Sequence, residues 1–429
     1  MSPTPATPPS APTRRWLPRL LLALVVALAL VVVATRIVLH PERSVPMILD
    51  RLGGALGLQL TAGGQSELVL RGTPTLVVRD LVARQPGAGK PVLTADRVLL
   101  SLPWSTIRDR GRRLELTRIE LDGPTLDLPA LRRWLSSRPP GESRMPSLGS
   151  GLRVRKGRVD AIGWHAEGLS IDVPRLHAGA PLQVAMRGRF VDQPTQVPFD
   201  LVLAMTRPAP EAGVAVAGTL DVQRRDWRLP ARILWSGPMR WRDGVLMVAP
   251  SRLASSGAYV SGDRRLPWVL GLHGPLRYAD GIASLAPAGV ALRGESPLPT
   301  FDGLGALALG GRLLLRLDGV TPGWPAGWPS LPPPLSASTS PVPLRLDYLG
   351  RASLADVARL RLRRDAARFD GSFRVPEVLA WIDDGIAGHP LPPLSGKASA
   401  PVLEISGARL EGVEIDIVDP RVPMPPTVP

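Results

Sequence analysis

The chain has 429 residues, of which 44% are hydrophobic, so it is long enough for two or three ordinary domains or for one extended β-structure. Its 43 glycines and 49 prolines break helices, which argues against a mostly helical protein. Because cysteine is absent, disulfides, thiolate catalysis and thiolate metal sites are excluded. The net charge is +15, but the arginines are spread along the chain rather than clustered with aromatic residues, so we expect no nucleic-acid partner.

The N-terminus combines a polar tail with a long apolar run. Residues 1–13 are rich in proline, serine and threonine, and we expect them to form a disordered cytoplasmic tail. Residues 20–35 are uncharged and lie between arginines, so residues 14–40 are predicted to form a single-pass transmembrane anchor with a cytoplasmic N-terminus. A cleaved signal peptide is the alternative, although no convincing cleavage site follows the run. The expected anchor residues are Arg14, Arg15, Arg19, Leu20, Leu28, Val33 and Arg36.

After the anchor, residues 44–60 begin like an amphipathic helix that is expected to pack on the first strands. From Glu67 onward the apolar period changes to two, which is typical of half-buried β-strands. The phase slips near Thr117, which predicts a β-bulge there. Asp-Gly pairs begin at positions 122, 243, 280, 302, 318, 370 and 384, and between alternating segments this pair is a signal for a hairpin turn. Not all seven need form two-residue turns, because Asp384 follows a helix-like stretch.

These patterns divide the chain behind the anchor into three parts. Residues 41–320 are predicted as one β-body, and residues 321–343 as an irregular connection in which Trp324 and Trp328 cover an apolar edge. Residues 344–429 are predicted as a C-terminal β-segment that continues the sheet. The expected fold class is mostly β: a transmembrane helix, then an elongated, curved, antiparallel sheet that forms an open groove, with a few short helices. A closed barrel and a two-sheet sandwich are the alternatives.

The sequence offers no constellation of catalytic residues. The five histidines do not have the short spacings of metal ligands, and no HExxH motif is present. The nucleophile motif GxSxG is missing, and the glycine-rich residues 303–311 lack both GxGxxG and the phosphate-binding lysine. We therefore expect a protein that is not an enzyme and that uses no cofactor or metal.

Two motifs near the N-terminus carry a resemblance to a known family. Residues 93–104 read LTADRVLLSLPW, and residues 119–128 read IELDGPTLDL. Together with the anchor, they resemble the N-terminal region of the AsmA-like family of bacterial envelope proteins, over residues 14–136. The resemblance implies an inner-membrane anchor and a periplasmic, bent β-sheet with an apolar concave face. It also implies a role in outer-membrane assembly or in phospholipid movement between membranes.

An apolar sheet face that no helix covers must be buried against something, and acyl chains are suitable partners. We therefore expect phospholipids and the inner membrane as partners. One alternative is a dry sandwich without lipid. Another is an anchored scaffold that docks an outer-membrane or secretion-system protein. The residues expected to form the lipid-binding face are Val98, Leu100, Leu102, Leu114, Leu116, Ile119, Leu121, Leu169, Ile171, Val173, Val413, Ile415 and Ile417.

Overall fold

The computed structural model describes residues 46, 49–50, 52–54, 56–69, 72–105, 115–137, 147–384 and 391–424. The expected cytoplasmic tail, residues 1–13, and the expected transmembrane anchor, residues 14–40 with all its named residues from Arg14 to Arg36, lie outside the described residues. Within the ranges just given, no helix is long and apolar enough to cross a membrane.

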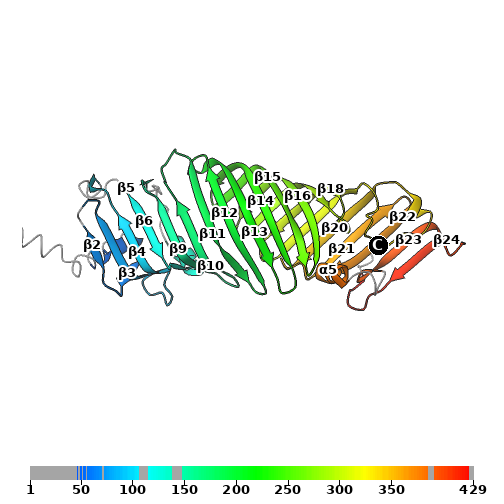
Figure 1. The fold of residues 1–429 in the computed structure, drawn as a ribbon, viewed down its shortest axis with the longest axis horizontal. Helices are drawn as coiled ribbons and strands as arrows, with labels where there is room; N and C mark the ends of the chain where they lie inside the picture. Colours follow the sequence, from blue (N-terminus) through cyan, green and yellow to red (C-terminus); the bar gives the residue numbers. More distant parts are fainter. Residues whose placement is uncertain are drawn as a thin grey trace, which may run out of the picture.

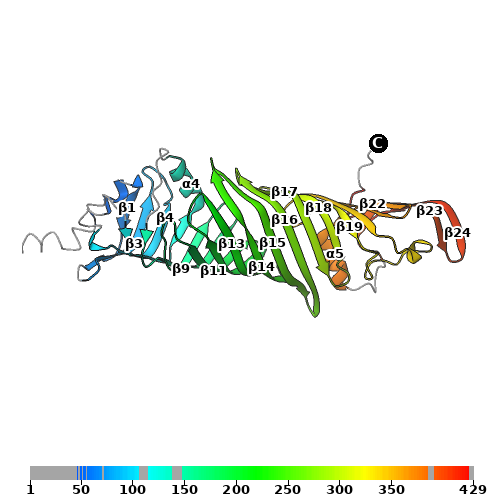
Figure 2. The same ribbon diagram turned by 90° about the horizontal axis from the view of Figure 1, so that it is seen from above.

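Over the residues just given, the protein is mostly β, with 22 strands in one sheet and two further short strands paired with each other. The molecule is elongated, and its strands lie across the long axis from the N-terminal strands at one end to the C-terminal strands at the other (Figure 1). The second view shows the same succession of strands along the molecule (Figure 2).

The N-terminal strands are β1 (Gln59–Ala62), β2 (Glu67–Val69), β3 (Thr75–Arg84), β4 (Leu93–Ser101), β5 (Glu115–Leu116), β6 (Arg118–Asp122), β7 (Thr125–Asp127), β8 (Ser147–Leu148) and β9 (Leu152–Asp160). The central strands are β10 (His165–Val173), β11 (Leu182–Asp192), β12 (Thr195–Met205), β13 (Glu211–Gln223), β14 (Arg228–Arg242), β15 (Val245–Ser261), β16 (Arg264–Ala279), β17 (Ile282–Gly294), β18 (Phe301–Leu309) and β19 (Leu313–Thr321). The C-terminal strands are β20 (Val342–Gly350), β21 (Val357–Arg364), β22 (Ala367–Arg374), β23 (Leu394–Ile405) and β24 (Ala408–Ile417).

The sheet is mixed, which corrects the expectation of a wholly antiparallel sheet. Strands β6 and β7 both pair with β9 in the parallel direction. Parallel neighbours need a crossover connection, and α4 (Leu128–Ser136) lies in the chain between β7 and β9. The side chain of Asp127 caps this helix by accepting a hydrogen bond from the backbone N–H of Ala130 at 2.7 Å.

From β9 to β24, each strand pairs antiparallel with the next one in the chain. This includes β19 and β20, which are direct neighbours although residues 322–341 lie between them in the sequence. The Pro/Trp-rich connection, which contains the short helix η1 (Leu335–Ala337), therefore leaves the sheet and returns to it. Hydrogen bonding across the sheet continues from the β-body into the C-terminal segment.

The N-terminal end of the sheet is covered by residues that precede β1 and by α4. Leu49 packs in one apolar cluster with Val78 and Val98, whose exposed fractions are 1% and 5%. The indole Nε1 of Trp134 on α4 donates a hydrogen bond to the carbonyl of Leu56 at 2.9 Å. The helical residues before β1 thus pack on the first strands, in agreement with the sequence.

Candidate functional site

One face of the sheet is apolar across its whole length. Directly paired residues lie on the same face because side chains alternate along a strand. One row of such pairs runs through Val78, Val98, Leu121, Val154, Ile171, Met186, Leu201, Gly218, Ile233, Ser255, Leu270, Leu292 and Phe301. A second row runs through Leu272, Val290, Gly303, Gly319, Leu344, Leu362, Phe369, Ala398 and Ile415. We call the face that carries both rows the apolar face.

Most of the residues expected to bind lipid lie on this face. These are Val98, Leu100, Ile119, Leu121, Leu169, Ile171, Val173, Val413, Ile415 and Ile417. Leu102 follows the end of β4, and Leu116 belongs to β5, which pairs with β8 outside the large sheet. Leu114 lies outside the described residues.

The opposite face of the sheet is charged, and we call it the charged face. Arginine and aspartate side chains from adjacent strands meet there as ion pairs. Examples are Arg97–Asp122 at 3.0 Å, Arg187–Asp200 at 2.6 Å, Arg293–Asp302 at 2.7 Å, Arg316–Asp347 at 3.1 Å and Arg359–Asp370 at 2.6 Å. Exposed pairs of this kind contribute little stability each. They do oppose a one-residue slip of a strand, because a slip would carry the charges to the apolar face.

The apolar face is covered to different degrees along the molecule. At the N-terminal end, Val98 is buried under Leu49 in the cluster described above. In the middle, the apolar side chains of Ile171, Leu201 and Ile233 are only half-buried. All described strands except β5 and β8 belong to the one sheet, so no second sheet stacks on this middle part. The middle of the apolar face is therefore partly open to solvent.

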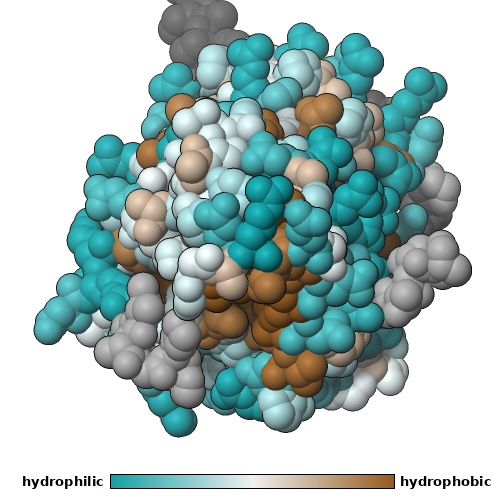
Figure 3. Space-filling view, turned by 90° about the vertical axis from the view of Figure 1, so that its right-hand side faces the viewer, coloured by the Kyte–Doolittle hydropathy of each residue, from teal (hydrophilic) through white to brown (hydrophobic). Residues whose placement is uncertain are grey.

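An apolar cavity of about 480 Å³ lies at the C-terminal end of the apolar face. Its walls come from the Pro/Trp-rich connection, from α5 (Val375–Asp384), and from strands β21 to β24. Representative lining residues are Trp328, Leu360, Val378, Trp381 and Ile415. The space-filling view of this end shows hydrophobic residues gathered in a hollow between hydrophilic ones (Figure 3).

The two tryptophans of the connection pack together, and Trp328 joins the connection to the segment between β17 and β18. The indole rings of Trp324 and Trp328 meet edge to face, with centroids 5.2 Å apart. Nε1 of Trp328 donates to the carbonyl of Pro297 at 3.0 Å, and Nε1 of Trp324 donates to the carbonyl of Pro329 at 2.9 Å. Trp328 also packs against an apolar cluster that includes Leu344. The expectation that these tryptophans cover apolar surface is thus met for Trp328.

Helix α5 links two distant parts of the sheet. It begins at the end of β22, and near its own end Asp383 accepts a hydrogen bond from the phenol of Tyr259 on β15 at 2.7 Å. Tyr259 lies on the apolar face and is 6% exposed. Burial, helped by this hydrogen bond, raises the pKa of Tyr259 to about 12. The helix, which also lines the C-terminal cavity, therefore contacts the apolar face at β15 as well.

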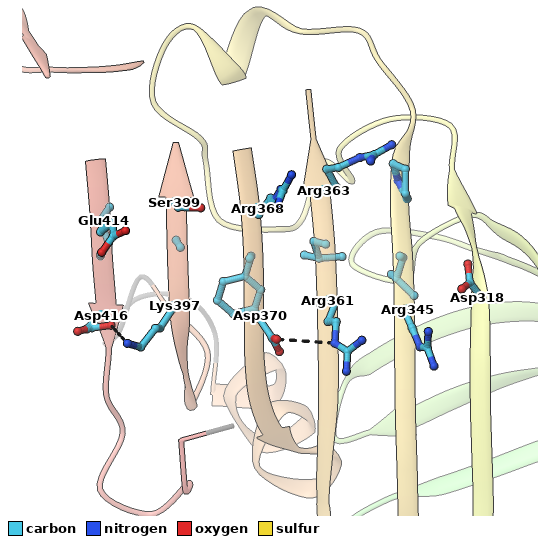
Figure 4. A pocket seen from close by; sticks show the side chains of 16 residues that line it. Asp318, Arg345, Arg361, Arg363, Arg368, Asp370, Lys397, Ser399, Glu414 and Asp416 are labelled. Carbon is cyan, nitrogen blue, oxygen red and sulfur yellow. Dashed lines mark ion pairs between the residues drawn. The ribbon is translucent and has the colours of Figure 1, made fainter. Parts of the chain in front are cut away.

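A polar basin of about 540 Å³ lies on the charged face at the same end of the sheet (Figure 4). Its ion pairs are long: Arg361 to Asp370 is 3.7 Å, and Lys397 to Asp416 is 3.9 Å. Its charged lining residues are Arg345, Arg361, Arg363, Arg368, Lys397, Asp318, Asp370, Glu414 and Asp416. Because the two signs of charge are interleaved, the basin lacks the field of one sign that would concentrate a charged ligand.

Within the part of the chain that the structure describes, no group of three or more histidine, aspartate or glutamate side chains could hold a metal ion. No protein-family model, no curated protein and no solved structure matches the chain.

Proposed function

We propose that the chain is an anchored envelope protein of the AsmA-like type that binds or conducts phospholipid acyl chains along its apolar face. The observation that carries the proposal is the long apolar face, which no second sheet of described strands covers in its middle part. Each methylene group removed from water contributes about 0.8 kcal/mol, so a row of half-buried aliphatic side chains is a favourable surface for an acyl chain. Such binding requires no nucleophile, metal or cofactor, and the proposed role is not enzymatic.

The proposed role places the anchor in the inner membrane and the sheet in the periplasm, where it supports outer-membrane assembly or lipid homeostasis. An apolar groove on an anchored protein shields acyl chains from water while they are away from a bilayer. The charged face, with its arginine–aspartate pairs, keeps the other side of the same sheet soluble.

The test places a charge on each face of one strand. Ile233 lies on the apolar face of β14, and its neighbour Leu234 points to the charged face with 55% of its surface exposed. The full-length chain and the variants Ile233→Asp and Leu234→Asp are isolated in an amphipathic polymer, and the co-purified phospholipids are counted by extraction and mass spectrometry. We expect Ile233→Asp to lose about half or more of its lipid, because an unpaired carboxylate is costly in apolar surroundings. Leu234→Asp should keep its lipid.

Circular dichroism checks that both variants retain the sheet. Equal lipid retention by both folded variants would refute lipid binding on the apolar face. Loss of lipid from Leu234→Asp alone would assign the lipid to the charged face and would also refute the proposal.

A second candidate function rests on the last strand. Among the described residues β24 pairs only with β23, so its other edge carries unpaired backbone groups that are suited to adding a partner strand. The chain would then be an anchored scaffold that docks an outer-membrane or secretion-system protein. An identified partner crosslinked through β24 of a chain that carries no lipid would favour this function over the first.

A further inference from the structure

At the C-terminal cavity, one arginine among the described residues interrupts the apolar face. Every second side chain of β21 points to the apolar face: Ala358, Leu360, Leu362 and then Arg364. Its side chain is 6% exposed and forms part of the cavity wall. The adjacent Arg363 has the opposite phase, lies on the charged face and is exposed.

Only some of the hydrogen-bond donors of the Arg364 guanidinium have an acceptor. Nε donates to the carbonyl of Leu335 at 3.0 Å, and Nη2 donates to the carbonyl of Ser338. Nη1 is buried and has no hydrogen-bond partner among the described residues. The neighbouring carboxylate of Asp365 is hydrogen-bonded to the hydroxyls of Ser338 and Ser340, which lowers its pKa.

The nearby Asp365 carboxylate interacts with the charge of Arg364 but forms no hydrogen bond to it among the described contacts. A buried guanidinium nitrogen without a hydrogen-bond acceptor remains costly. No aspartate or glutamate lines the cavity, and the other lining residues are mainly aliphatic, aromatic and proline side chains, with Ser330, Ser399 and Arg368. A ligand that satisfies both features has an anionic head for Arg364 and an apolar tail for the walls.

We propose that this cavity binds one single-chain anionic amphiphile, with its carboxylate or phosphate at the guanidinium of Arg364 and its tail against Trp328 and Ile415. The volume of about 480 Å³ suits one chain. The inference rests on the proposed function, in that acyl chains reach the cavity along the apolar face.

The test uses the full-length chain and three probes that share one tail and differ in the head: dodecanoate, dodecyl phosphate and dodecanol. Each probe carries a diazirine near its methyl end. After irradiation, peptide mass spectrometry reads the labelling of residues 322–341 and of α5, and the probe concentration at half-maximal labelling gives the affinity. The variants are Arg364→Met, which removes the charge at similar length, Arg364→Lys, which retains it, and Arg363→Met, the matched control on the charged face.

We expect Arg364→Met to weaken labelling by the anionic probes about tenfold to a hundredfold, as for the loss of a charge-assisted hydrogen bond, and to leave dodecanol unchanged. Arg363→Met should match the wild type, and Arg364→Lys should retain part of the preference for anions. The comparison of dodecanoate with dodecyl phosphate identifies which head the site prefers. Circular dichroism verifies that each variant is folded, and Arg364→Lys carries the test if Arg364→Met does not fold.

Two outcomes would overturn the inference in different ways. If wild type and Arg364→Met bind all three probes equally, Arg364 does not recognise the head group, while acyl binding on the apolar face still stands. If none of the probes labels the wild-type cavity, both the inference and acyl occupancy of this end of the apolar face are refuted.

Discussion

The contact between Tyr259 and Asp383 predicts a specific loss of stability at alkaline pH. The folded protein raises the pKa of Tyr259 from its usual value of about 10 to about 12, chiefly by burial. The unfolded chain therefore releases the phenol proton at lower pH than the folded chain does. Stability from this group is fully present below pH 10 and is lost as the pH rises through 12.

The size of this effect follows from the pKa difference. One pKa unit corresponds to about 1.4 kcal/mol, so the rise to about 12 corresponds to at most about 3 kcal/mol. The substitution Tyr259→Phe removes the titrating group and the hydrogen bond to Asp383. We therefore expect the wild type to be more stable than Tyr259→Phe at pH 9, and the difference to shrink toward pH 12.

Two measurements on the full-length chain test this prediction. The chain has three tyrosines, so the titration of tyrosinate absorbance in wild type and variant isolates Tyr259 by difference. Thermal unfolding of both proteins across the same pH range gives the change in stability. A difference titration centred near pH 10, or a stability difference that does not vary with pH, would refute the inferred burial of this phenol against α5.

Two further predictions concern the N-terminal end of the sheet. Replacing the capping residue Asp127 by alanine should lower the free energy of unfolding by about 1 kcal/mol, because the hydrogen bond to the Ala130 N–H is lost. The loss of the helical circular dichroism signal on heating measures this change. An unchanged profile would contradict the capping role. Val98→Asp should destabilise the folded protein by about 4 kcal/mol or more, because Val98 is 5% exposed and packs under Leu49. Ile233→Asp should destabilise it less, because the side chain of Ile233 is only half-buried. Equal thermal shifts for the two variants would contradict the difference in burial.

Alternation of apolar residues was sufficient to predict the apolar face. Leu169, Ile171 and Val173 share a phase in the sequence and a face in the structure, because the strand period leaves no other arrangement once the strand is formed. The same reasoning failed at Leu116. The predicted slip at Thr117 is a break between β5 and β6, and β5 pairs with β8 outside the large sheet.

The Asp-Gly pairs show where a turn signal depends on its surroundings. Asp243 and Asp280 have positive φ and form the predicted tight hairpin turns. Gly303 and Gly319 instead lie opposite each other inside β18 and β19, so the prediction was wrong there. A Cβ on either glycine would come within 2.7 Å of the ring of Phe301, so both glycines make room for that ring. Such packing arises only after distant strands have met, and no local pattern reveals it.

The parallel pairing of β9 with β6 and β7 could not be predicted either, because the sequence of α4 does not specify beside which strand the chain returns to the sheet. Arg364, by contrast, had a readable signal. In RLRLRRDAARF, from 359 to 369, the residues in the phase of Leu360 and Leu362 are apolar up to Arg364. A charge in an apolar phase marks either an error in the strand assignment or a site where the charge has a partner.

The covering of the N-terminal end constrains how an acyl chain could use the proposed groove. Leu49 and α4 occupy the apolar side of the first strands, and Val78 and Val98 are already buried there. An acyl chain that binds the apolar face therefore contacts it from about β10 onward, where Ile171 and Leu201 are half-buried, and not at the N-terminal edge of the sheet. The acyl chain would then reach the apolar face from the side, over the ends of the central strands. Asp substitutions at Val98 or Leu121 would report on folding, whereas substitutions at Leu201 or Ile233 would report on occupancy of the groove.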